Sequence, residues 1–209
     1  MVINFNSGGI DDLFISSNGG DLNFESSDDL SISSNGGELI SGSIDDDILA
    51  SLDGNDTLFG KEGDDILAGV DGNDSLSGGA GNDTLNGGGS GFKDDTIFIT
   101  ADTSGIDTLT GGAGEDLFIL GGKSASELEN NSDSIVYYDE AGDDDLAIIT
   151  DFNPTEDVIM LGASANDYSL VNLPASSELY FGNELVATLE GNTGLSLNNS
   201  YFLFPASDV

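Results

Sequence analysis

Histidine and cysteine are missing from the 209 residues of this chain, and lysine and arginine together number only 3. Without cysteine there are no disulfides and no thiolate metal sites, and without histidine there are no imidazole ligands and no imidazole general base. So few cations cannot hold a phosphate backbone or adhere to an anionic membrane. These absences exclude the usual zinc sites and histidine-based triads, and they argue strongly against a nucleic-acid partner.

Long apolar runs are missing as well. No stretch approaches the ~18 residues that a membrane-spanning helix needs, so no membrane span is expected. The N-terminal stretch MVINFNSGG has no basic region followed by an apolar run. We therefore expect no cleavable signal peptide.

Acidic residues, in contrast, are abundant. Aspartate and glutamate number 40, which gives a formal net charge of −37. Charge at this level is typical of disordered chains, yet 37% of the residues are hydrophobic and they are regularly spaced. The combination favours a fold that forms only when something positive neutralises it.

An acid recurs every nine residues in the middle of the chain, and a leucine or isoleucine follows two residues after each acid. Glycine stands two residues before most of these acids, as in GGAGNDTLN (78–86). The period lengthens by three residues twice, to Asp95 and to Asp107, and returns to nine at Asp116. The evenly spaced acids are Asp47, Asp56, Asp65, Asp74 and Asp83.

The flanking segments carry weaker patterns. DDLFISSNGG (11–20) recurs seventeen residues later as DDLSISSNGG, which we interpret as the same solenoid in degenerate form, with Asp and Gly no longer at the loop positions. Beyond about residue 121 the pattern fades, and strand-like runs such as DVIML and SYFLF follow. The predicted parts are an N-terminal solenoid segment (1–41), a regular roll (42–120), an irregular excursion (121–145) and a β-rich cap (146–209).

The nine-residue spacing explains why a cation is needed. Two units complete a flattened coil, so residues 18 apart stack with adjacent strands ~4.8 Å apart. We expect Asp47, Asp65 and Asp83 to form one column, and Asp56, Asp74 and Asp95 the other. Neighbouring carboxylates at this spacing repel by roughly 1 kcal/mol in water and about 3–4 kcal/mol at an effective dielectric near 20.

Calcium suits such columns because it takes 6–8 oxygens from carboxylates and backbone carbonyls, whereas magnesium demands a tight octahedron. Glycine lets each turn adopt positive φ and brings carbonyl oxygens toward an ion. The leucines point inward as a thin ladder between the columns. Because that core is small, we expect the free energy of binding to be free energy of folding.

These units resemble the RTX (repeats-in-toxin) nonapeptide G-G-x-G-x-D-x-U-x. GGAGNDTLN and GGAGEDLF fit it as far as they run, while GSIDDD (42–47) has an acid in place of the third glycine. The resemblance covers about residues 42 to 120, and the C-terminal part is similar to cyanobacterial RTX proteins. The candidate calcium-binding residues are Asp47, Gly54, Asp56, Gly63, Asp65, Gly72, Asp74, Gly78, Gly81, Asp83, Asp95, Asp107, Gly111, Gly114 and Asp116.

The resemblance implies an all-β fold, a right-handed parallel β-roll, that binds roughly four to six calcium ions in its turns. It also implies export by type I secretion machinery through an uncleaved C-terminal signal, and hence a secreted or cell-surface protein. We expect no enzyme, because nothing resembling the catalytic part of an RTX enzyme is left over and the acids form no unique pair of the kind that a glycosidase needs.

Several alternatives remain open from the sequence. The chain could be a calcium-gated adhesin or partner-binding module, or a secretion tag in which the C-terminal unit matters most. Asp151 and Asp157 either ligate a final ion or shape a turn. Tyr137, Tyr138 and Tyr180 could contact carbohydrate, although packing is the more common role for such aromatics. Ice binding is disfavoured because the outward loop positions carry no threonine row.

Overall fold

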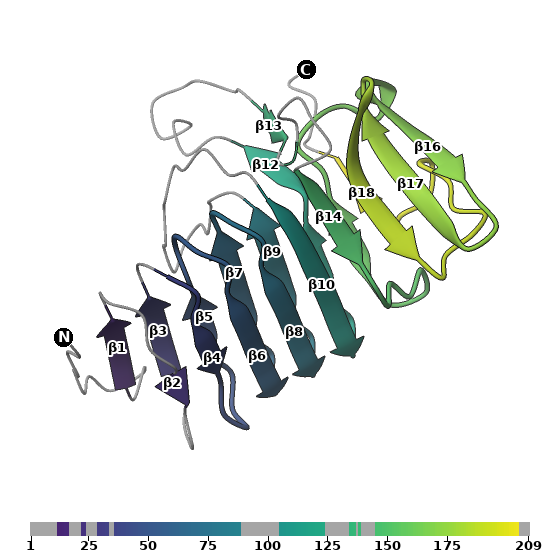
Figure 1. Cartoon of the computed structure of the whole chain (residues 1–209). Coiled ribbons are helices and arrows are strands. Elements are labelled where there is room, and N and C mark those ends of the chain that lie inside the picture. Colours follow the sequence, from purple (N-terminus) through teal and green to yellow (C-terminus); the bar gives the residue numbers. More distant parts are fainter. Residues whose placement is uncertain are drawn as a thin grey trace.

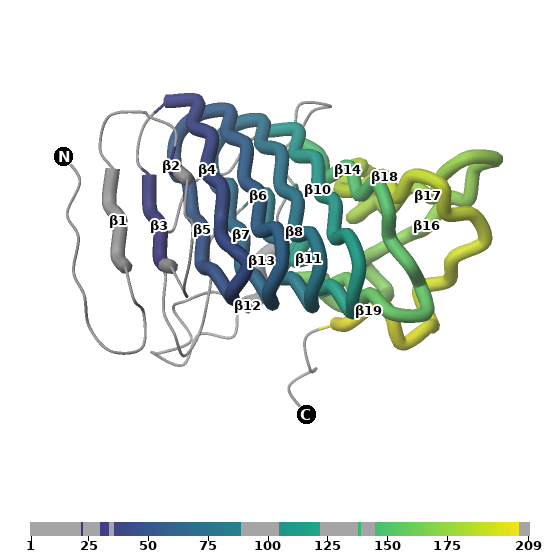
Figure 2. The backbone as a smooth tube through the Cα atoms, turned by 90° about the horizontal axis from the view of Figure 1, so that it is seen from below, coloured from purple at the N-terminus to yellow at the C-terminus, as the bar shows by residue number. Residues whose placement is uncertain are grey.

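The computed structural model describes residues 12–16, 22–23, 29–33, 36–88, 105–123, 134–136, 138 and 145–204. From residue 12 to residue 119, successive described strands alternate between two sheets, so that the backbone winds as a flattened coil (Figure 1, Figure 2). The sheets lie face to face, and Figure 2 shows the turns stacked along the axis of the coil.

The first sheet has eight strands, each paired in parallel with the next. In spatial order they are β1 (Asp12–Ser16), β3 (Asp29–Ser33), β5 (Ile48–Ala50), β7 (Ile66–Val70), β9 (Thr84–Gly88), β11 (Leu117–Ile119), β15 (Val158–Met160) and β19 (Phe202–Leu203).

The second sheet has nine strands and is parallel except at one end. In spatial order they are β2 (Leu22–Asn23), β4 (Leu39–Ser41), β6 (Thr57–Glu62), β8 (Ser75–Ala80), β10 (Ile106–Ala113), β14 (Leu146–Ile149), β18 (Glu184–Glu190), β17 (Ser176–Phe181) and β16 (Tyr168–Asn172). The last two strands pair antiparallel.

Three short elements lie outside these sheets. Strands β12 (Gly121–Lys123) and β13 (Ser134–Val136) form an antiparallel pair, and Ala165–Asp167 forms a 3₁₀ turn, η2. No helix in the described residues is long and apolar enough to cross a membrane. The architecture confirms the predicted all-β parallel roll with a β-rich C-terminal end.

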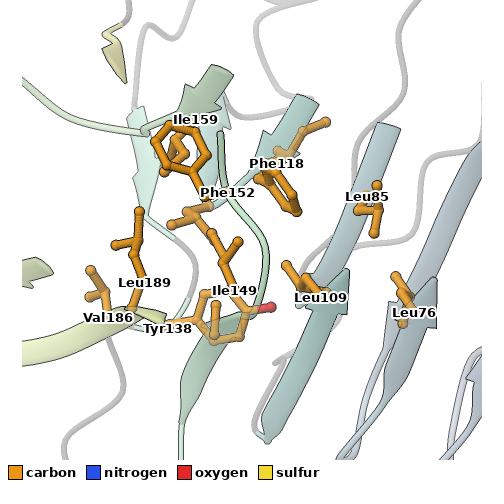
Figure 3. Packing of buried hydrophobic residues seen from close by; sticks show 14 of the residues in the cluster. Leu76, Leu85, Leu109, Phe118, Tyr138, Ile149, Phe152, Ile159, Val186 and Leu189 are labelled. Carbon is orange, nitrogen blue, oxygen red and sulfur yellow. The ribbon is translucent and has the colours of Figure 1, made fainter. Parts of the chain in front are cut away.

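The core is a ladder of one large apolar side chain per strand. Leu49, Leu67 and Leu85 are in register in one sheet, and Leu58, Leu76 and Leu109 are in register in the other. All six are at most 1% exposed, because alternation along each strand turns the residue two places after the acid inward (Figure 3). The prediction that these leucines form the core is confirmed.

The N-terminal coils keep the same backbone register. Strand β3 aligns Leu30 with Ile48, so Asp29 stands where Asp47 stands one coil later, and Asp12 aligns with Asp29. For this sheet, the prediction that Asp no longer holds the loop position is therefore wrong. The change lies two residues further along, since Ser31 takes the buried place that leucine fills in the regular repeats.

The register also corrects one predicted column. Strand β10 follows β8 at a spacing of 33 residues, with Thr108 beside Ser75, and β11 follows β9 at the same spacing. The roll therefore skips fifteen residues beyond its normal period of 18, and Asp107 takes the place that was predicted for Asp95. Asp95 lies outside the described residues.

The C-terminal unit continues both sheets. Strand β14 pairs with β10 and β15 pairs with β11, which extends the roll by another coil. Strands β16, β17 and β18 then form an antiparallel meander at the end of the second sheet (Figure 1). Phe152 packs against Phe118 of the repeats, with 6.2 Å between the ring centroids, and both belong to one core cluster. The boundaries of the four parts stay a prediction.

Candidate metal centre

The repeated acids stand at the ends of the turns, each directly before or at the start of a strand. Their side chains are buried, with exposed fractions between 1% and 3%. Burial of so many carboxylates is costly unless each one is hydrogen-bonded or neutralised. The described acids in this position are Asp47, Asp56, Asp65, Asp74, Asp83, Asp107 and Asp116.

In the first column, the backbone N–H of each acid donates to the carboxylate of the acid one coil further on. The N–H of Asp47 donates to Oδ1 of Asp65 at 2.8 Å, and that of Asp65 to Oδ1 of Asp83 at 2.9 Å. The column continues to Asp116 and ends at Asp157, at 2.9 Å and 3.1 Å. These charge-assisted hydrogen bonds offset part of the repulsion that stacking creates.

The second column follows the same rule and begins one coil earlier than predicted. The N–H of Glu38 donates to Oδ1 of Asp56 at 2.7 Å, and the series continues through Asp74 to Asp107. Glu38 is buried and was missed by the sequence prediction. Its position 18 residues before Asp56 was a usable signal, but the repeat pattern is defined by aspartate and position 38 carries glutamate.

A second hydrogen-bond ladder runs along the outside of the turns in the opposite sense. The side chain of Asn55 accepts from the N–H of Asn73 at 2.9 Å, and that of Asp64 accepts from the N–H of Asn82 at 2.7 Å. The residue before each of the five evenly spaced acids, Asp47 to Asp83, is therefore Asn or Asp for a structural reason. The sequence prediction overlooked this ladder, although the recurring Asn-Asp pairs are a signal for it.

Four aspartates of the two columns each keep one carboxylate oxygen that is buried and has no hydrogen-bond partner. These atoms are Oδ2 of Asp56, Asp65, Asp74 and Asp83. An unpartnered buried polar atom costs about 1–3 kcal/mol, and more if it is charged. Four equivalent cases at one repeat position point to a site for a positive group rather than to a local irregularity.

Glycines shape two sides of the space around these oxygens. A Cβ on Gly78 would lie 2.2 Å from Oδ2 of Asp83, and one on Gly111 would lie 2.2 Å from Oδ2 of Asp116. Only glycine therefore permits the close approach of the turn to the carboxylate. The predicted Gly78 and Gly111 serve this purpose.

The other predicted glycines have positive φ, between 113° and 145°, which ordinary side chains rarely adopt. They also stack against carbonyl oxygens: a Cβ on Gly72 would lie 1.7 Å from the carbonyl oxygen of Gly54. The turns thus bring backbone carbonyls close to one another from coil to coil. The residues of this class are Gly54, Gly63, Gly72, Gly81 and Gly114.

Burial raises the pKa of these carboxyl groups. The pKa of Asp65 rises to about 7 and that of Asp74 to about 8, first through loss of solvent and then through neighbouring carboxylates. Burial likewise raises the pKa of Asp107 to about 7 and that of Asp116 to about 6. In the absence of a cation, the turns therefore disfavour the charged form of these carboxyl groups.

The donor set fits a hard cation. Within the described residues, no three carboxylates converge on one point, so acidic side chains alone do not enclose an ion. Each turn instead offers carboxylate oxygens together with stacked carbonyl oxygens, which is the mixture that calcium accepts. The chain has no cysteine and no histidine, so softer metals are disfavoured.

Comparison with known families agrees with this chemistry. A family model described as "RTX calcium-binding nonapeptide repeat (4 copies)" matches residues 32–67, 59–90 and 101–122. The chain carries RTX repeats. The match begins upstream of residue 42, in keeping with the place of Glu38 in the second column.

Two solved structures are similar to the chain. One is the AlgE6R3 subunit of the mannuronan C5-epimerase of Azotobacter vinelandii, at 20% identity and a TM-score of 0.43, covering 83% of this chain and 81% of that chain. The other is the extracellular lipase LipA of Serratia marcescens, at 15% identity and a TM-score of 0.32, covering 86% of this chain and 40% of the lipase. A comparison with curated proteins found no match.

Three other acids of the columns differ from the four aspartates with an unpartnered oxygen, because the chain itself supplies a donor to their Oδ2. The N–H of Ser43 donates to Asp47 at 2.6 Å, and the N–H of Asn153 donates to Asp157 at 2.7 Å. Tyr138 donates its hydroxyl to Asp107 at 2.7 Å.

Asp151 has a different role from Asp157. Its two carboxylate oxygens accept the N–H groups of Gly111 and Gly112, each at 2.9 Å. Asp157 ends the first inner column. Asp151 therefore binds the backbone of the turn at Gly111 and Gly112. Asp157 is the last carboxylate of the first column.

Proposed function

We propose that the chain is a calcium-binding RTX roll with a structural, non-enzymatic role, and that calcium bound between stacked turns drives its folding. The observation that carries the proposal is the set of four buried, unpartnered Oδ2 atoms, on Asp56, Asp65, Asp74 and Asp83. Calcium next to these oxygens would remove their desolvation cost and the repulsion along each column. The free energy of binding would then appear directly as free energy of folding.

The location follows from the same chemistry. We propose that the chain stays expanded by self-repulsion where free calcium is scarce and folds outside the cell, where calcium is millimolar. By resemblance, export would use type I secretion machinery and a C-terminal signal. A structural role at the cell surface or in an extracellular matrix fits a rod that becomes rigid on leaving the cell.

The adhesin alternative calls for a large exposed apolar patch. Among the described residues, the exposed large apolar side chains are dispersed over several elements. Leu39 and Phe59 lie on β4 and β6, whereas Val171 lies on β16 and Leu203 on β19. This dispersion favours the structural role over a partner-binding surface in that part of the chain.

The test is a calcium titration of the metal-free protein at pH 7, followed by far-UV circular dichroism, with magnesium as the control. We expect a cooperative gain of β signal with calcium and none with magnesium. A chain that is already folded without metal, and indifferent to calcium, would overturn the proposal.

Adjacent residues provide a matched pair of variants. Asp65→Asn and Asp64→Asn each remove one charge and keep an oxygen that can accept the ladder hydrogen bond, from the N–H of Asp47 and of Asn82 respectively. Asp65 is buried, whereas Asp64 is exposed. We expect Asp65→Asn to raise the calcium midpoint about tenfold or more, equivalent to about 1.4 kcal/mol, and Asp64→Asn to change it little.

A further inference from the structure

Tyr138 reaches the repeats from a distant part of the chain. It lies between β13 and β14, it is 2% exposed, and its backbone has a φ of 62°, in the left-handed region. Its ring belongs to the same core cluster as the leucine ladder (Figure 3). Its hydroxyl enters the turn between β9 and β10, at the place where the roll skips fifteen residues.

The hydroxyl makes two hydrogen bonds there. It donates to Oδ2 of Asp107 at 2.7 Å and accepts from the N–H of Gly88 at 2.6 Å. The same carboxylate oxygen is buried and unpartnered on Asp56 and Asp74, the two preceding aspartates of this column. Tyr138 therefore gives Asp107 what the other two lack, a positive dipole directed at Oδ2.

The surroundings of the hydroxyl do not suit a cation. A Cβ on Gly87 would lie 2.5 Å from the Tyr138 oxygen, so that oxygen fills the space beside this glycine. The N–H of Gly88 points into the same space, and a backbone N–H repels a metal ion. In the other column, the carboxylates at the two ends of the described ladder, Asp47 and Asp157, likewise receive an N–H from their own turns.

We propose that Tyr138 closes the turn of Asp107 against calcium and so ends the series of ion sites in the second column at Asp74. The hydroxyl takes the place of an ion, and Asp107 is a structural rather than a calcium-binding residue. This inference rests on the proposed calcium function. It makes Tyr138 a positioning residue that sets how many ions the roll takes up.

The first test compares two aspartates of one column by equilibrium dialysis of the full-length protein against calcium at pH 7. Asp107→Asn and Asp74→Asn both keep an acceptor for the ladder N–H. We expect Asp107→Asn to bind as many ions as the wild type, and Asp74→Asn to bind at least one fewer. Loss of an ion in Asp107→Asn would overturn the proposal.

The second test is a double-mutant cycle measured as the Tm in saturating calcium. In the wild-type background, Asp107→Asn breaks a good hydrogen bond and should lower the Tm. In the Tyr138→Phe background, Asp107 has lost its donor, so Asp107→Asn removes an uncompensated buried charge and should raise the Tm. A lower Tm in both backgrounds would show that an ion sits at Asp107, and would overturn the proposal.

Tyr180→Phe is the matched control for Tyr138→Phe, since it also removes a phenol that donates to a carboxylate, that of Glu178 at 2.8 Å. It should leave both the ion count and the effect of Asp107→Asn unchanged. Failure of the underlying calcium function has a distinct signature, because the wild type and every variant would then bind no ions at all.

Discussion

The repeats and the C-terminal unit reach the same roll by different means. In the repeats, each strand contributes one leucine to the core, and buried carboxylates line both edges. In the C-terminal unit, aromatic side chains pack against one another, as Phe152 does with Tyr201 at 5.8 Å between ring centroids and Tyr168 does with Phe181 at 5.2 Å.

The difference teaches where stability comes from. An aromatic cluster buries a large apolar area and needs no further partner. A single leucine per strand buries much less, and it must offset the cost of the neighbouring carboxylates. We therefore expect the repeats to depend on ions and the C-terminal unit to depend on its apolar core.

Calcium removal at pH 7 should separate the two regions most strongly. We expect backbone amides of β6 to β9 to lose their protection from hydrogen exchange almost completely, while those of β16 to β18 keep a measurable part of theirs. Hydrogen exchange with peptide-level mass spectrometry, with and without calcium, makes the measurement. Equal loss of protection in both regions would contradict the comparison.

Acid should partly replace calcium in the repeats. The pKa values of Asp65 and Asp74 in the fold are about 7 and about 8, against about 3.9 in an unfolded chain. Between roughly pH 4 and pH 8 the metal-free fold therefore holds protons that the unfolded chain has released. Its stability should be greatest near pH 4 and fall as the pH rises, by up to about 1.4 kcal/mol per pH unit for each group.

Thermal unfolding of metal-stripped protein from pH 4 to pH 8, followed by circular dichroism, tests this dependence. Saturating calcium should flatten the profile, because the ions then replace the protons. A rise in the stability of the metal-free protein from pH 4 to pH 8 would contradict this prediction.

Phe152 connects the two regions, since its ring packs against Phe118 of the repeats and Tyr201 of the C-terminal unit. Phe152→Ala should destabilise the calcium-loaded protein by about 3–5 kcal/mol, because it leaves a cavity at this junction. Val171→Ala, at a residue that is 43% exposed, should change stability by no more than about 0.5 kcal/mol. Chemical denaturation of both variants in calcium makes the comparison.

The smallest expected effect concerns backbone strain inside the repeats. Lys61 has a φ of 96°, at the position where later turns carry Gly79 and Gly112. Lys61→Gly should be more stable than Lys61→Ala by about 1 kcal/mol, since both lose the ammonium contact with the Gly42 carbonyl but only glycine relieves the strain. Equal Tm values for the two variants would contradict this account.

Much of the roll was predictable because single residue types recur at its period. A leucine two places after an acid, repeated every nine residues, fixes both the coil and its inward face. The glycine positions follow from the same spacing. The failure at Asp95 has a physical cause: the unit of Asp95 and Ile97 keeps the local pattern, but only strand pairing decides which unit enters the stack.

The remaining features depend on contacts that a local pattern does not carry. The hydroxyl of Tyr138 meets Gly88 across fifty residues of chain, and Glu38 fills an aspartate position with a longer side chain. Sequence spacing could name the acids, but it could not say which of them have a second donor.

The fifteen residues that the roll skips between β9 and β10 have a consequence for how such a protein changes over generations. Both neighbouring strands keep their partners, at the same spacing of 33 residues. The entropy cost of closing a loop grows only slowly with its length. A turn of this roll is therefore a place where new sequence can be acquired without disturbing the strands on either side, and a regular scaffold can gain new properties one turn at a time.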